Sequence, residues 1–143
     1  MAKIERTIAI NAPVEKVYEY LTTPMNLLEI WPSMVEIKDI QNPGVVGGGF
    51  HWVYKMAGMK LEGATEYSEV IPCQRFVARN TGGISSTLVW LYQPENGGTR
   101  LTLQAEYTVP LPLVGKLAEA FIVKQNEHEM DTLFANLKAR MEE

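Results

Sequence analysis

The stretch IAINAPVEKVYEYL, residues 8–21, decides the fold, because it reads as a β-strand that runs directly into an α-helix. Alternating isoleucines over residues 3–10 indicate the strand. Asn11 is predicted to cap the helix, and Pro13 to lie in its first turn, where its missing N–H costs nothing. Apolar residues then recur at helical spacing until a Thr-Thr-Pro sequence ends the helix. A second short helical turn is predicted over residues 25–30.

The other end of the chain, from about residue 114 to 142, is predicted to form one long helix without an interrupting proline. Apolar residues at helical spacing give its C-terminal half one buried stripe. This stripe consists of Met130, Leu133, Phe134, Leu137 and Met141. Continued towards the N-terminus, it passes through Asn126, Val123, Ile122 and Glu119, whereas Leu117 and Phe121 fall on the opposite side.

Between the two ends, short runs of alternating apolar and polar residues are separated by glycine-containing turns, which predicts six β-strands. They are predicted to begin near Val35 and then to span residues 50–56, 61–71, 75–80, 84–92 and 99–109. The order strand, two helices, six strands and long helix predicts a single α+β domain over residues 1–143. In it, a curved antiparallel sheet wraps around the C-terminal helix and leaves an internal cavity between sheet and helix.

The composition excludes several classes of protein. Apolar residues make up 46% of the chain and charged residues 21%, so disorder is not expected. No apolar run approaches the roughly 20 residues that cross a bilayer, and from the first residues we expect no secretory signal. Lys and Arg are scattered singly in a chain of net charge −4, so we expect no nucleic-acid partner. A single cysteine fits a reducing compartment, and we expect the protein to be cytoplasmic.

The residues that usually carry catalysis or hold metals are few and scattered. His51 and His128 both fall on polar faces, where a solvated histidine is the plainer interpretation. Cys73 follows a proline at a strand end, far in sequence from both histidines, and is expected to be an inert, half-buried thiol. Zinc needs three or four ligands together, and the glycine run at residues 47–49 lacks the Lys-Ser/Thr of a phosphate-binding loop. We therefore predict no catalytic residue, no metal and no cofactor.

Aromatic side chains are the positive sign of a binding site. They exceed what a sheet needs to pack on one helical stripe, and Tyr and Trp carry polar ends that prefer partners when buried. The predicted ligand-binding residues are Trp31, Phe50, Trp52, Tyr54, Leu61, Tyr67, Trp90, Leu103, Tyr107, Ile122, Asn126 and Met130. Glu119, Asn126 and Glu69 are the polar residues expected nearest this pocket. Asn126 is the strongest of the three, because an amide within an apolar stripe requires a hydrogen-bond partner.

Three segments resemble one known group of proteins. Residues 10–18 match an Ala-Pro opening of the first helix, and residues 98–103 match a Gly-Thr-Arg turn into the last strand. Residues 110–119 and 133–138 match the terminal helix. Together they resemble the START/Bet v 1-like (SRPBCC) superfamily, and within it the polyketide cyclase/dehydrase and lipid-transport branch. The resemblance covers essentially the whole chain and implies a helix-grip fold.

This superfamily holds several functions on one scaffold, so the fold alone does not select one. The favoured hypothesis is binding or carriage of a small, largely apolar molecule, such as a lipid, a polyketide or an aromatic metabolite. An enzyme of the polyketide cyclase or dehydratase kind is the first alternative, and it would need a general acid or base in the pocket. A protein-interaction module of the co-chaperone or quinone-chaperone kind is the second, with a homodimer through Leu117 and Phe121 as one form of partner.

Overall fold

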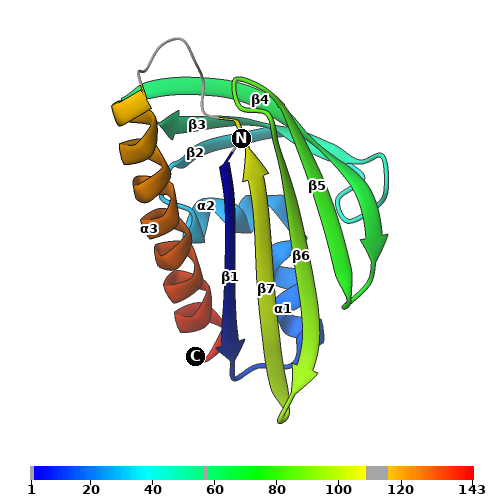
Figure 1. Ribbon diagram of the computed structural model, residues 1–143. Coiled ribbons are helices and arrows are strands. Elements are labelled where there is room, and N and C mark those ends of the chain that lie inside the picture. The colour runs from blue at the N-terminus through cyan, green and yellow to red at the C-terminus, as the bar shows by residue number, and fades with distance from the viewer. Residues whose placement is uncertain (1, 57, 109–115) are drawn as a thin grey trace.

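The computed structural model describes residues 2–56, 58–108 and 116–143, the first four residues of the last range by their backbone alone. The elements follow the predicted order (Figure 1). The strands are β1 (Ala2–Ile10), β2 (Met34–Gln41), β3 (Gly49–Met56), β4 (Met59–Ile71), β5 (Arg75–Gly82), β6 (Ser86–Glu95) and β7 (Gly98–Tyr107). The helices are α1 (Val14–Leu21), the 3-10 turn η1 (Pro24–Asn26), α2 (Leu27–Ile30) and α3 (Lys116–Met141).

The seven strands form one antiparallel sheet in the order β1-β7-β6-β5-β4-β3-β2. The sheet curves around α3, and α3 lies beside edge strand β1 (Figure 1). β6 and β7 meet at a two-residue turn of Asn96 and Gly97, whose φ values of 51° and 81° are those of a type I′ hairpin. The predicted α+β helix-grip architecture is confirmed.

The start of α1 differs from the prediction. The N-cap is Pro13, with φ −62° and ψ 150°, and its carbonyl accepts the N–H groups of Lys16 and Val17. Asn11 lies two residues before this N-cap, and no side-chain cap hydrogen bond is made there. Instead, the Asn11 backbone N–H donates to Glu142 Oε2 over 2.8 Å, so Asn11 helps to fix the end of α3.

The buried stripe of α3 is confirmed. Met130, Leu133, Phe134, Leu137 and Met141 are all buried, and Leu137 has no exposed surface. Phe121 is 62% exposed, as its place on the opposite side predicts. The side chains of Leu117 and Glu119 lie outside the described residues.

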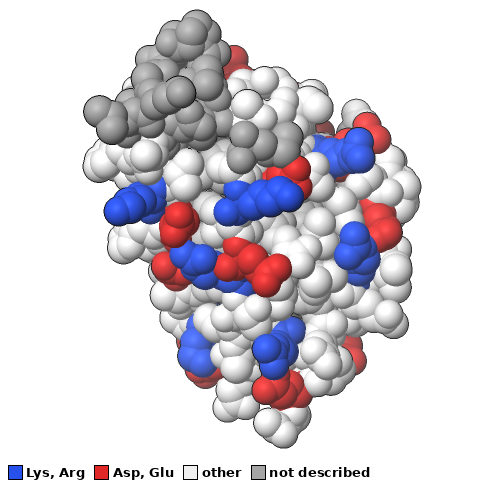
Figure 2. Space-filling model, viewed as in Figure 1, with Lys and Arg blue, Asp and Glu red and all other residues white. Residues whose placement is uncertain are grey.

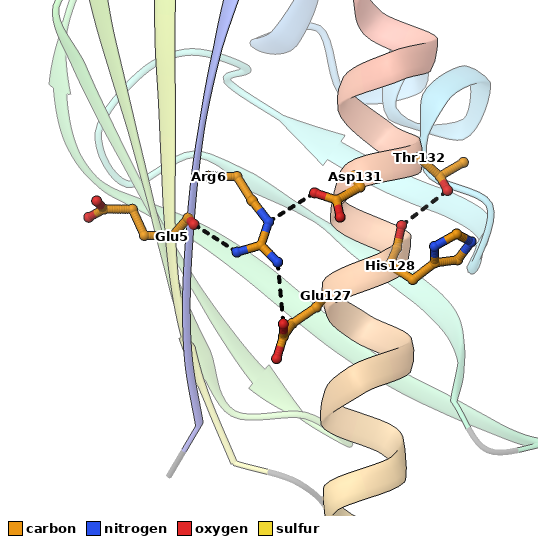
Figure 3. A network of polar contacts seen from close by, with 6 residues as sticks. All are labelled: Glu5, Arg6, Glu127, His128, Asp131 and Thr132. Atoms are coloured by element: carbon orange, nitrogen blue, oxygen red, sulfur yellow. Dashed lines mark hydrogen bonds and ion pairs between the residues drawn. The ribbon is translucent and has the colours of Figure 1, made fainter.

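Polar contacts hold α3 against β1. Arg6 Nε donates to Asp131 Oδ1 over 2.9 Å, and Arg6 Nη2 donates to Glu127 Oε2 over 3.3 Å (Figure 3). Nearer the C-terminus, Lys138 Nζ donates to the carbonyl of Ala9 over 2.9 Å. On the face seen in Figure 2, Lys and Arg side chains alternate with Asp and Glu, so the described part of this face carries no continuous basic stripe.

Candidate functional site

A cavity of about 120 Å³ lies between the concave face of the sheet and the helices. All seven strands contribute side chains to its wall, and so do α1, η1, α2 and α3. The wall is mostly aliphatic and aromatic. A cavity of roughly 150 Å³ admits a benzene ring, whereas typical ligand sites measure roughly 300–1,000 Å³. The space therefore suits one aromatic ring or a short alkyl group, and a larger ligand requires side chains to move.

Ten of the twelve residues predicted to bind a ligand line this cavity. They are Trp31, Phe50, Trp52, Tyr54, Tyr67, Trp90, Leu103, Tyr107, Asn126 and Met130. Leu61 does not line it, because its side chain packs beside Gly83 at the margin of the core. Ile122 does not line it either. It is buried in the core one helical turn before Asn126.

Aromatic rings contact one another along the wall, both between neighbouring strands and within one strand. Tyr67 and Phe76 lie 4.8 Å apart between ring centroids, and Trp52 lies 6.5 Å from Tyr54 in an edge-on arrangement. Gly63 makes room for Trp52, because a Cβ at Gly63 would lie 2.4 Å from the indole ring. Burial raises the pKa of the Tyr67 phenol to about 12, so it is neutral at physiological pH.

Trp52 carries a polar group that the described protein does not satisfy. Only 4% of the residue is exposed, and its indole Nε1–H is buried with no hydrogen-bond partner among the described residues. Leaving such a donor unpaired costs roughly 1–3 kcal/mol. The Nε1 atom is itself buried, so an acceptor on a ligand reaches it only if neighbouring side chains move.

A row of polar side chains crosses the concave face, which the sequence reasoning missed. The strand register pairs Tyr107 with Ser86, Ser86 with Asn80, and Asn80 with Thr65. Thr65 Oγ1 donates to Asn80 Oδ1, and Asn80 Nδ2 donates to Ser86 Oγ over 2.9 Å. Asn126 Nδ2 donates to the Tyr107 hydroxyl over 3.2 Å from α3. The sequence did contain a signal for this row, since Thr65 lies two residues before Tyr67 on β4 and therefore faces the same side of the sheet.

Glu129 is the second feature that the sequence reasoning missed. Its Oε1 accepts the backbone N–H of Ser33 over 2.7 Å and the Tyr54 hydroxyl over 3.5 Å, and its Oε2 accepts Ser33 Oγ over 2.5 Å. The Tyr54 hydroxyl also accepts Trp31 Nε1–H over 3.2 Å. Burial, and next the charge of Glu129, raise the pKa of Tyr54 well above its usual value. Glu129 lies one helical turn after Asn126 and beside Met130, which could have indicated its place.

The comparison with protein families agrees with this geometry. The family model described as polyketide cyclase/dehydrase and lipid transport matches residues 1–142. The chain belongs to this family. The resemblance to the START/Bet v 1-like superfamily is thereby confirmed. No curated protein matches the chain.

Solved structures share the fold at low sequence identity. TTHA0849 from Thermus thermophilus is 20% identical, with a TM-score of 0.79, and the match covers 98% of this chain and 97% of that one. The Aha1 dimer from Colwellia psychrerythraea is 18% identical, with a TM-score of 0.68 and coverage of 99% and 97%. Ara h 8.0201 is 11% identical, with a TM-score of 0.70 and coverage of 98% and 97%. At these identities the likeness supports the helix-grip fold alone.

Two of the three polar residues expected nearest the pocket have described side chains, and of these two Asn126 lines the cavity. Glu69 was wrongly placed there. It pairs with Arg75, and its side chain is 43% exposed. A register shift between Tyr67 and Glu69 interrupts the alternation of β4, so positions counted from Tyr67 no longer predict the inner face. Glu119 lies outside the described side chains.

His51, His128 and Cys73, the residues considered for catalysis or metal binding, do not line the cavity. His51 is exposed and contacts Asp39 over 2.8 Å, and His128 is exposed on α3. Burial, and next the charge of Glu15, raise the pKa of the Cys73 thiol, which disfavours the reactive thiolate. Within the described residues there is no group of three or more His, Cys, Asp or Glu placed to hold a metal. No helix in that part of the chain is long and apolar enough to span a membrane.

Proposed function

We propose that this protein binds or carries a small, largely apolar molecule in the cavity between the sheet and α3. The observation that carries the proposal is a cavity lined mostly by aromatic and aliphatic side chains, contributed by every strand of the sheet and by α3. A ligand with a largely apolar body gains from burial against this wall. Membership of the polyketide cyclase/dehydrase and lipid transport family supports ligand binding in general. Lipids, polyketides and aromatic metabolites remain the candidate classes.

Native mass spectrometry of freshly purified protein tests this function without a guess about the ligand. We expect a co-purifying apolar molecule, released on denaturation. Titration with small aromatic compounds is the second test, because Trp31, Trp52 and Trp90 all line the cavity and report on its contents. Saturable quenching of tryptophan fluorescence is expected. No co-purifying molecule and no saturable quenching across a broad lipid and aromatic library would contradict the proposal.

An enzyme of the cyclase or dehydratase kind is the second candidate, favoured by the carboxylate of Glu129 in the cavity wall. Such a reaction needs a general acid or base within reach of the substrate. Incubation with a reactive poly-β-ketone should then give cyclised product with loss of water, and Glu129→Gln should abolish it. Unchanged turnover in Glu129→Gln would remove Glu129 from this role.

The homodimer and the cytoplasmic location both stay predictions. Phe121 is exposed, and we propose that it contributes to a homodimer together with Leu117. Light scattering of the wild type and of Phe121→Ser checks this, and a monomeric wild type contradicts it. The cytoplasmic location rests on the single cysteine, and fractionation of the native host checks it.

A further inference from the structure

The described part of the cavity wall contains one formal charge. Among the described lining residues, Glu129 is the only one with an ionisable acidic or basic side chain other than tyrosine. No ion pair of Glu129 occurs in the described part of the chain. Arg6 of β1 instead pairs with Glu127 and Asp131 of α3 (Figure 3), and neither of these residues lines the cavity. Within the described residues, the Glu129 carboxylate is held by neutral donors alone.

Those donors leave acceptor capacity on Glu129. A carboxylate offers about four acceptor positions. Ser33 fills one on each oxygen, through its N–H at 2.7 Å and its hydroxyl at 2.5 Å, and the Tyr54 hydroxyl is a distant third at 3.5 Å. A donor on a ligand therefore finds a charged acceptor in the wall. A carboxylate on a ligand would instead lie near like charge within a mostly apolar wall, which is unfavourable.

We propose that Glu129 makes the cavity selective for ligands that present a hydroxyl, phenol or amine, and makes it reject carboxylates, free fatty acids among them. The inference rests on the proposed function and narrows its ligand class. The polar end of the ligand meets Glu129, and its apolar body meets the aromatic wall. Neutral alcohols and phenols then outrank fatty acids of equal size.

Three compounds that share a tolyl group test this selectivity at a size that suits the cavity. Toluene has no polar end, p-cresol adds a donor, and p-toluate adds an anion. Binding to the wild type is followed by NMR through the indole Nε1–H signals of Trp31, Trp52 and Trp90. We expect p-cresol to bind at least about tenfold more tightly than p-toluate, with toluene between them. Equal affinities for p-cresol and p-toluate would overturn the proposal without any variant.

Glu129→Gln removes the charge and keeps the shape. The Gln oxygen can still accept the Ser33 N–H, and the amide N–H can donate to Ser33 Oγ, so the fold should survive. We expect p-cresol to bind more weakly, because the charged acceptor is lost, and p-toluate to bind more tightly, because the like charge is lost. The preference for p-cresol over p-toluate should therefore fall by at least about tenfold. Glu127→Gln is the matched control, because it removes the same charge from the same helix outside the cavity.

The outcomes separate this inference from the function on which it rests. A preference that is unchanged in Glu129→Gln, or that falls equally in Glu127→Gln, overturns the role of Glu129 while toluene binding still supports the cavity. Failure of all three compounds to bind, toluene included, overturns the binding function itself.

Discussion

At the scale of single residues, Asn126 is where the structure decides between two roles. Its amide donates to the Tyr107 hydroxyl, so it has a protein partner irrespective of a ligand. We expect Asn126→Leu to destabilise the protein by about 1 kcal/mol, or roughly 3 °C in Tm, because the Tyr107 hydroxyl loses a donor. Thermal unfolding and p-cresol affinity measured on one variant test this. A lower affinity with an unchanged Tm would contradict the structural role and make Asn126 a ligand contact.

Tyr67 gives a prediction for alkaline pH. Burial raises its pKa from 10.0 to about 12, so its contribution to stability is fully present below pH 10 and is lost as the pH rises towards 12. We expect the Tm of the wild type to fall across this window and that of Tyr67→Phe to fall less. Melting curves at pH 7 provide the control for the change in packing. An identical alkaline loss in both proteins would show that Tyr67 does not contribute.

At the scale of elements, α3 supplies a large share of the core. Met130, Leu133, Phe134 and Leu137 are buried, and each contributes on the order of 1.5–3 kcal/mol, against a total stability of about 5–15 kcal/mol. Truncation before Met130 should therefore unfold the protein and not merely open the cavity. Circular dichroism on heating tests this. A truncated chain that melts cooperatively near the wild-type Tm would contradict the burial of this stripe.

Phe121→Ala is the control on the same helix. Phe121 is 62% exposed in the single chain, so at concentrations where the protein is monomeric its truncation should change stability by only about 0.5 kcal/mol or less. A large loss at Phe121 would instead indicate that another surface covers it.

At the scale of the whole molecule, the cavity lowers stability, because side chains around an unfilled space lose packing contacts. Ala105 lines it from β7, and Ala105→Val adds two methyl groups to an unfilled space. We expect stability to stay equal or to rise by about 0.5–2 kcal/mol, whereas toluene affinity falls. Ala9→Val, on the exposed side of β1, controls for the strand propensity of valine. Unchanged toluene affinity in Ala105→Val would argue that ligands bind elsewhere.

Most of the fold could be predicted because periodicity is a local property. The alternation of Phe50, Trp52, Tyr54 and Met56, and the helical recurrence of Leu133 and Leu137, report directly which face of each element is apolar. Most of the predicted cavity residues followed from those faces alone. The prediction of Asn11 as a helix cap was wrong, since the residue type permits capping but the backbone of Pro13 determines where the first turn begins.

What the sequence could not determine depends on residues that are distant along the chain. The polar row of Thr65, Asn80 and Ser86 exists because strand register brings three separate positions side by side, and the shift after Tyr67 turned Glu69 away. Glu129 becomes a cavity residue only through the packing of α3 against the segment that holds Ser33, far away in sequence. The sequence alone determined which face of each helix and strand is apolar, because the spacing of apolar residues within one element shows that face. Only tertiary packing decided the size of the cavity and the place of Glu129 in its described wall. Both depend on how closely the helices and strands approach one another.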